Sequence, residues 1–319
     1  MDCDRCGGEA VYHAAYSGNH LCGPHLRESV EKRVRRRIRR DGLIPASASP
    51  DDPETWVIGL SGGKDSVVLA HVLHETFAED PRVDLVALTI HEGIEGYRDE
   101  SLDAAGALAE DLGIRHEVVS YDDEFGVRMD DVVEDDPEEM AACAYCGVFR
   151  RDLLERYASD LGATKLLTGH NLDDEAQTAL MNVLSGDVGQ MAKHFDASLG
   201  PFEGRADAPF VPRAKPLRDV PEKEVALYAR LADLPVHMAT CPHSSEAYRG
   251  EIQRLLFDLE DRHPGTRHSI IAGYEELAGM AAERYKREES PDLHACEECG
   301  AQTTRRVCRK CSLLSSLTG

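Results

Sequence analysis

One glycine-rich segment has the residue types and spacing of a phosphate-binding turn. It stands between the apolar runs 56–60 and 67–73 and consists of Ser61, Gly62, Gly63, Lys64, Asp65 and Ser66. This order predicts a strand, a tight turn and a helix start, because glycine permits positive φ angles and a helix N-terminus presents unpaired N–H groups to anions. We therefore expect the segment to hold a phosphate or pyrophosphate; the alternative is an ordinary glycine turn. The lysine follows only two glycines, so this is not the GxxxxGK[ST] loop.

A second candidate segment follows an expected strand at 165–168 and leads into an expected helix. Its sequence, over residues 169–178, is Gly-His-Asn-Leu-Asp-Asp-Glu-Ala-Gln-Thr. Asp173 or Asp174 is a candidate ligand for Mg²⁺ or for ATP-dependent chemistry, and we include Gly169 among the nucleotide-binding candidates. The alternative is that these acidic residues only cap the helix, since carboxylates are favourable near a helix N-terminus.

The ends of the chain carry two groups of residues with the spacing of structural zinc sites. In each group, pairs of ligands two residues apart can bind one ion from tight turns, and four filled positions leave none for a substrate. We predict one zinc ion at Cys3, Cys6, Cys22 and His25, and a second at Cys296, Cys299, Cys308 and Cys311.

Three cysteines remain after these two groups are assigned: Cys143, Cys146 and Cys241. Three thiolates on a [4Fe-4S] cluster would leave one iron open to a substrate or a sulfide. A zinc site with His243 as fourth ligand and a redox CxxC pair with a persulfide-carrying cysteine are the alternatives. The spacing alone does not separate these three interpretations.

Strand and helix patterns alternate through the middle of the chain and must position these residues. We predict strands at 56–60, 83–91, 115–121 and 165–168, with helices at 64–79, 99–112, 147–161, 173–184, 221–233, 246–262 and 269–288, and an acidic loop at 122–136. Repeated βα units predict an α/β fold with a doubly wound parallel sheet, here with an N-terminal and a C-terminal zinc module. Ligands of such sheets bind beyond the carboxyl ends of the strands, where both candidate segments fall.

The chain divides into four expected parts. Residues 1–50 form a zinc knuckle and a basic helix, and residues 51–215 form the ATP-binding catalytic domain. Residues 216–290 form a helical part that carries Cys241, and residues 291–319 form a zinc ribbon. The sequence contains no run of eighteen apolar residues and does not begin with a signal peptide, so we expect a cytoplasmic protein without a membrane span.

Charge is distributed unevenly along the chain. The net charge is −23, and lysine provides only 8 of the 36 basic residues. This composition resembles that of proteins from salt-loving archaea, so the net charge does not by itself exclude a nucleic-acid partner. Residues 27–40 instead carry eight basic and two acidic side chains. We expect this helix to contact RNA phosphates through Arg35, Arg36 and Arg37; the alternative is a solvated helix paired with nearby acids.

Several motifs together resemble those of a known family. The loop at 61–66 resembles the PP-loop of the ATP pyrophosphatase superfamily, which cleaves ATP between the α and β phosphates. With the segments at 93–98, 143–151, 169–178, 215–225 and 241–249, it resembles the TtcA/TtuA family of tRNA 2-thiolation enzymes. The terminal zinc modules resemble those of the branch that contains the archaeal and eukaryotic cytoplasmic tRNA 2-thiouridine synthases. The resemblance covers nearly the whole chain.

This resemblance implies specific roles. Residues 61–66 would bind the pyrophosphate of ATP, Asp174 would act in ATP or Mg²⁺ binding, and the three central cysteines would ligate a [4Fe-4S] cluster. Arg150 stands where some relatives have a catalytic lysine, so the charge is kept but a titratable amine is not. The implied partners are tRNA and a ubiquitin-like sulfur-carrier protein, and the implied assembly is a homodimer. The alternatives are a tRNA cytidine 2-thiolase and a non-catalytic zinc-finger RNA-binding protein.

Overall fold

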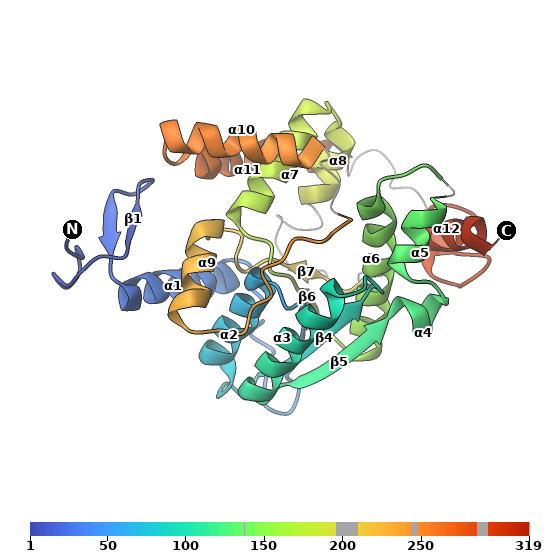
Figure 1. The fold of residues 1–319 in the computed structure, drawn as a ribbon, viewed down its shortest axis with the longest axis horizontal. Coiled ribbons are helices and arrows are strands. Elements are labelled where there is room, and N and C mark those ends of the chain that lie inside the picture. The colour runs from blue at the N-terminus through green and yellow to red at the C-terminus, as the bar shows by residue number, and fades with distance from the viewer. Residues whose placement is uncertain (137, 196–209, 244–247, 286–292, 319) are drawn as a thin grey trace.

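The protein is described by a computed structural model over residues 1–136, 138–195, 210–243, 248–285 and 293–318 (Figure 1). Its centre is a sheet of parallel strands, which are β3 (Glu54–Gly59), β4 (Val83–His91), β5 (Arg115–Ser120), β6 (Lys165–Leu167) and β7 (Arg213–Ala214). Residues 85–90 of β4 are all buried, which is typical of a strand covered on both faces.

The strand order places β3 in the middle of the sheet, and the direction of winding changes there. The order is β5-β4-β3-β6-β7, so the chain moves outward from β3 to β5 and then returns to β6 on the other side of β3. Loops that follow the two strands at such a switch point diverge to opposite faces and leave a crevice. The segment 61–66 follows β3 and the segment 169–178 follows β6, so both lie at this crevice.

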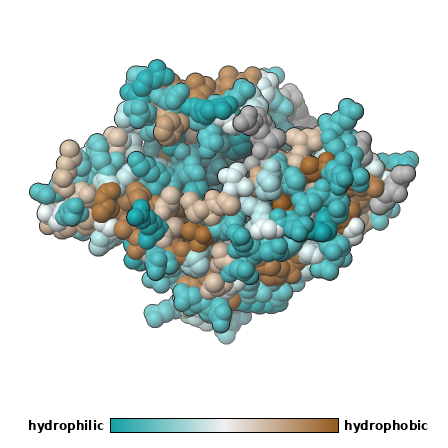
Figure 2. Space-filling model, in the orientation of Figure 1, coloured by the Kyte–Doolittle hydropathy of each residue, from teal (hydrophilic) through white to brown (hydrophobic). Residues whose placement is uncertain are grey.

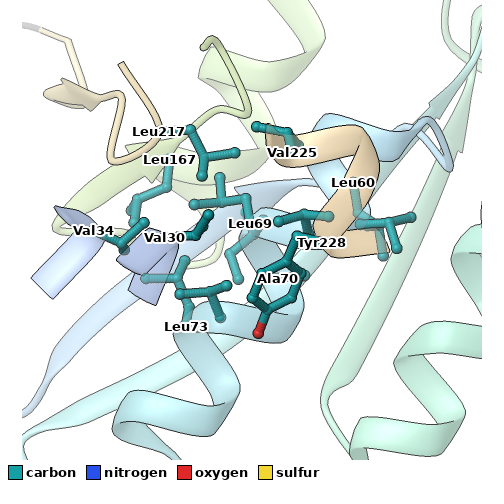
Figure 3. Close-up of a cluster of buried hydrophobic side chains, with 14 of the residues drawn as sticks. Val30, Val34, Leu60, Leu69, Ala70, Leu73, Leu167, Leu217, Val225 and Tyr228 are labelled. Carbon is teal, nitrogen blue, oxygen red and sulfur yellow. The ribbon is translucent and has the colours of Figure 1, made fainter. Parts of the chain in front are cut away.

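Helices cover both faces of the sheet, which confirms the predicted doubly wound arrangement. One face is covered by α1 (Gly23–Arg40), α2 (Lys64–Phe77), α3 (Tyr97–Leu112) and α9 (Glu222–Leu231). Figure 3 shows Val30 of α1, Leu69 of α2 and Tyr228 of α9 converging in the core on this side. The other face is covered by α4 (Tyr121–Phe125), α5 (Met129–Asp135) and α6 (Ala142–Asp160), with Phe149 and Leu153 buried beneath α6.

A separate group of helices packs beyond the carboxyl ends of the strands. It consists of α7 (Leu172–Leu184), α8 (Val188–His194), α10 (Tyr248–Arg262) and α11 (Thr266–Tyr285), and it lies above the sheet in Figure 1. Leu172, Ile252 and Tyr274 share its apolar core. Figure 2 shows the molecule hollowed below this group, with hydrophilic side chains lining the hollow. Among the helices that the structure describes, none is long and apolar enough to cross a membrane.

The two ends of the chain form small modules at opposite ends of the molecule (Figure 1). The N-terminal module pairs β1 (Tyr12–Ala14) with β2 (Asn19–Leu21) and continues into α1. The C-terminal module pairs β8 (His294–Ala295) with β9 (Gln302–Thr303) and continues into α12 (Arg309–Thr318), which packs on α6.

The structure differs from the sequence expectation mainly in its short elements. The stretch 122–136, predicted as a loop, contains α4 and α5; the side chain of Ser120 caps α4 by accepting from the N–H of Asp123, and Met129 and Val132 anchor α5 in the core. The elements α8 and β7 were not predicted, because they are only 7 and 2 residues long. Positions 246, 247 and 286–288 of the predicted helices lie outside the described residues, and the division into four parts stays a prediction.

Candidate functional site

A cleft at the carboxyl ends of β3, β4 and β6 brings most of the predicted site residues together. Its volume is about 510 Å³. The predicted residues that line it are Ser61, Gly63, Asp65, Ser66, Cys143, Cys146, Arg150, Gly169, Asp174 and Cys241. They come from segments far apart in the sequence, and the switch point of the sheet accounts for their convergence.

The turn after β3 has the geometry expected of a phosphate-binding loop. Gly62 has a φ of +79°, a value that glycine adopts without strain. Gly63 occupies the N-cap position of α2 and carries no side chain that could cap the helix. The first N–H groups of α2 are therefore oriented to receive an anion, as at other phosphate-binding helix starts.

The turn after β6 is held tightly against this loop. A β-carbon at position 169 would lie 2.8 Å from the carbonyl carbon of Asp65 and from the nitrogen of Ser66, so only glycine fits there. The side chain of Asn171 donates to Asp65 Oδ1 at 2.9 Å and also caps α7. The two candidate segments therefore pack directly against each other as one unit.

Two carboxylates face the cleft from this unit, Asp65 and Asp174. Burial raises the pKa of Asp174 to about 6, and the nearby charge of Asp65 contributes to the rise. Two carboxylates that repel each other in a partly dry cleft favour a divalent cation bound with phosphate oxygens. The capping role considered for Asp174 is also present, because its side chain accepts from the N–H of Asn171 at 3.1 Å.

Lys64 and Asp173 are not among the residues that line the cleft. Lys64 pairs with Asp65 at 2.9 Å and with Glu222 at 2.8 Å, and it is not among the residues that line the cavity. Burial on its own would lower the pKa of Lys64, but these two carboxylates raise it. Asp173 accepts from the N–H of Glu222 at 2.8 Å and pairs with Arg267. Their assignment to nucleotide binding therefore stays a prediction.

The three central cysteines approach the cleft from two segments. Cys143 and Cys146 lie in the first turns of α6, which begins five residues earlier than predicted, and Cys241 lies beyond α9. The donor set fits an iron–sulfur cluster, because all three thiols line one cleft and the other seven cysteines belong to the terminal modules. Burial raises the pKa of Cys146 and of Cys241.

The alternative zinc site with His243 has a competing contact in the structure. His243 lines the cleft, but its Nε2 lies 2.5 Å from Asp130 Oδ1. Within the described chain, the groups whose ligand atoms all lie within 4.8 Å of one another are the two terminal groups, and the central cysteines form no such group. A wider spacing of the three cysteine sulfur atoms suits a four-iron cluster better than a single zinc ion, because the cluster is larger than one ion.

Both terminal groups gather their predicted ligands. Cys3 Sγ and Cys22 Sγ lie 3.3 and 3.2 Å from His25 Nδ1. In the C-terminal group, the N–H of Cys308 donates to Cys296 Sγ at 3.2 Å and lowers the pKa of that thiol to about 6. In each group the four ligand atoms lie within 4.8 Å of one another, so both groups fit a single bound ion.

The basic helix is less available for RNA than predicted. Arg37 is buried with 2% of its side chain exposed, and it pairs with Asp41 at 2.9 Å and Asp219 at 3.8 Å. Arg33 pairs with Glu224 inside the protein. The expected RNA contact through Arg37 is therefore wrong, because this side chain faces the interior, whereas Arg36 and Arg39 are exposed.

Further residues at the site were not singled out from the sequence. Glu92 follows β4 directly, and its carboxylate accepts from Arg150 Nε at 2.8 Å. His237 lines the cleft, and its backbone N–H donates to the carbonyl oxygen of Gly62 at 2.9 Å. The position of Glu92 at the carboxyl end of a strand is a signal that could have identified it.

Comparisons with known proteins agree with this geometry. Residues 30–240 match the family described as PP-loop domain, and residues 2–27 match the one described as 2-thiouridine synthetase TtuA, N-terminal LIM domain. The chain is 71% identical over 318 residues to the tRNA 2-thiolation protein NcsA of Haloferax volcanii, covering 99% of both chains. It is 38% identical to the cytoplasmic tRNA 2-thiolation protein 1 of Caenorhabditis elegans, covering 98% of this chain and 79% of that one.

A solved structure extends the similarity to the whole fold. The U34-tRNA thiolase NcsA from Methanococcus maripaludis, solved with its [4Fe-4S] cluster, superposes with a TM-score of 0.82 at 35% sequence identity. The match covers 99% of this chain and 96% of that one.

Proposed function

Because the chain belongs to the PP-loop family of tRNA 2-thiolation proteins, we propose that it is an ATP-dependent tRNA sulfurtransferase that makes 2-thiouridine. The observation that carries this proposal is the single cleft in which the phosphate-binding loop, the carboxylates of Asp65 and Asp174 and three cysteines meet. The name of the solved relative supports a uridine over a cytidine, and the wobble position as the one modified.

The loop and the carboxylates suit an activation step. The C2 oxygen of the uridine attacks the α-phosphate of ATP, and pyrophosphate leaves. The N–H groups at the start of α2 would stabilise the departing pyrophosphate, and Asp65 with Asp174 would hold a Mg²⁺ ion that offsets its negative charge. The carbonyl oxygen thereby becomes part of a good leaving group, because it departs as AMP.

The cysteines suit the sulfur step. A ubiquitin-like carrier with a C-terminal thiocarboxylate releases hydrosulfide when water cleaves it. The hydrosulfide forms a C–S bond at C2, the C–O bond breaks, AMP leaves, and the proton passes to solvent, so no oxidant or reductant is consumed. A [4Fe-4S] cluster held by Cys143, Cys146 and Cys241 would supply an iron without a protein ligand, which can bind hydrosulfide. Arg150 places a permanent positive charge beside these anions.

The activity can be tested on tRNA itself. We expect nucleosides from a strain that lacks the gene to have lost 2-thiouridine, and the wild-type gene to restore it. A plasmid copy with Asp174→Asn should fail to restore it. Unchanged 2-thiouridine in the deletion strain, with no second enzyme present, would exclude this function.

The cofactors can be tested by metal analysis of protein purified without oxygen. We expect iron and sulfide at four equivalents each, lost in Cys143→Ala, and two equivalents of zinc that this variant keeps. Zinc at three equivalents without iron would show that the central cysteines hold zinc.

We also propose that the protein is a homodimer and that it is cytoplasmic. Light scattering of the purified protein would test the first, and fractionation of cells would test the second.

A further inference from the structure

Glu92 is a buried carboxylate that the proposed chemistry does not use. It follows the last residue of β4, and none of its side chain is exposed. Two guanidinium groups, from Arg98 and Arg150, bond to it. A carboxylate buried to this extent is costly unless it is paired and hydrogen-bonded, so the arrangement of its two partners is tightly constrained.

The first partner, Arg98, connects Glu92 to the phosphate-binding turn at residues 61–66, which we call the nucleotide loop. Arg98 is also buried, and its Nη1 donates to the carbonyl oxygen of Ser61 at 3.0 Å and to Ser101 Oγ at 2.9 Å. Ser61 is the first residue of the phosphate-binding turn, and Ser101 packs against Gly62. Through these two hydrogen bonds, Arg98 holds the backbone of this turn in place against α3.

The second partner connects Glu92 to the cysteine site. Arg150 lies one helical turn after Cys146 on α6, and its Nη2 donates to Cys146 Sγ at 3.2 Å while its Nε bonds to Glu92. The side chain of Arg150 is 48% exposed, so without Glu92 only its contact with Cys146 would oppose a move into solvent. Arginine does not lose its proton in proteins, so this contact supplies charge and orientation rather than a proton.

We propose that Glu92 is a positioning residue that holds the nucleotide loop and Cys146 in a fixed relation through Arg98 and Arg150. Glu92 is not among the residues that line the cleft, so it acts through its partners and not on the substrate. The three groups carry a net charge of +1, and they contact the turn at 61–66 through Arg98 and Cys146 through Arg150. This inference rests on the proposed function, since that function requires the two sites to act on one uridine.

The test measures each connection separately in purified protein without tRNA. ATP affinity reports on the loop, and the reduction potential of the reconstituted cluster reports on the contact with Cys146, because hydrogen bonds to cluster sulfurs tune that potential. The variants are Glu92→Gln, Arg150→Gln and the double variant. Glu54→Gln is the control for loss of a buried carboxylate, because Glu54 pairs with Lys165 at the opposite end of β3. Arg156→Gln is the control on α6, because Arg156 is 43% exposed and pairs with Glu124.

We expect Glu92→Gln to weaken ATP binding about tenfold, the loss typical of a charged hydrogen bond, while both controls bind as the wild type does. Arg150→Gln should make the potential more negative, because a positive charge is lost beside the cluster. In the Glu92→Gln background the same substitution should shift the potential much less, since Arg150 is already released.

Two results would overturn the inference. The first is wild-type ATP affinity in Glu92→Gln, and the second is the same shift by Arg150→Gln in both backgrounds. If Glu92→Gln does not fold, Arg98→Lys and Arg150→Lys test the two connections singly, the first by ATP affinity and the second by potential. A protein that passes these tests but does not thiolate tRNA would refute the proposed function and leave the positioning role standing.

Discussion

Gly62 lies directly against Ser101, so closely that a β-carbon at position 62 would sit 1.9 Å from the carbonyl oxygen of Ser101. The nucleotide loop after β3 is thus packed onto the first turns of α3, and Arg98 on the same helix donates a hydrogen bond to the carbonyl oxygen of Ser61 in the loop. The conformation of the loop therefore depends on α3 as well as on its own glycines.

Gly62→Ala should accordingly disable nucleotide binding. The new methyl group cannot fit, and the φ of +79° is unfavourable for alanine, so we expect a stability loss of about 2–4 kcal/mol and at least about tenfold weaker ATP binding. Calorimetric titration with ATP and denaturant unfolding would measure both effects.

Gly106→Ala is the matched control for this substitution. Gly106 lies within α3, and apart from its chain neighbours and the nearby backbone of its own helix, no atom lies within 4 Å of the position its β-carbon would take. Alanine there should raise stability by about 0.5–1 kcal/mol and leave ATP binding unchanged. Equal behaviour of the two variants would contradict the packing argument.

The contrast between local and long-range features explains what could be predicted from the sequence. The turn at 61–66 and the terminal cysteine pairs were predictable because their chemistry depends on spacings of a few residues. The network around Glu92 was not, because Glu92 and Arg150 are 58 positions apart and meet only when β4 and α6 pack together. The burial of Arg37 does have a signal in the sequence, because Arg37 continues the apolar positions Val30 and Val34 on one face of α1.

Asp174 should reduce the stability of the protein at neutral pH. Its folded pKa of about 6 lies above the ordinary value near 4, so the folded state binds the proton more tightly and stability rises as the pH falls from about 7 to 4. Asp174→Asn should therefore be more stable than the wild type by about 3 kcal/mol at pH 8, and the gain should vanish below pH ~4. Urea unfolding across this range would show it, and a constant difference at every pH would contradict it.

Metal removal should loosen the C-terminal module and the helix it supports. Leu313 of α12 is fully buried in the core that also contains Phe149 of α6, and Lys310 Nζ lies 3.3 Å from Asp152. We expect Cys296→Ser to speed hydrogen exchange in α12 by about 100-fold or more, because a metal bound by these cysteines would contribute folding free energy to this module.

Cys3→Ser is the matched control for that variant. It removes a ligand at the opposite end of the molecule, so it should speed exchange in the β1–β2 hairpin and leave α12 protected. If both variants affected both ends equally, the modules would not be independent.

The exposed arginines of α1, and not the buried one, should contribute to tRNA binding. Arg36→Glu with Arg39→Glu should weaken tRNA binding at low salt about tenfold or more and reduce its salt dependence, while ATP binding stays unchanged. The control is Arg254→Glu with Arg262→Glu, which makes the same change of charge on the exposed surface of α10. An equal loss of tRNA binding in this control would mean that total charge, and not α1, governs the affinity for tRNA.

Arg37→Ala should instead destabilise the fold by about 3 kcal/mol, because it leaves Asp41 without its partner.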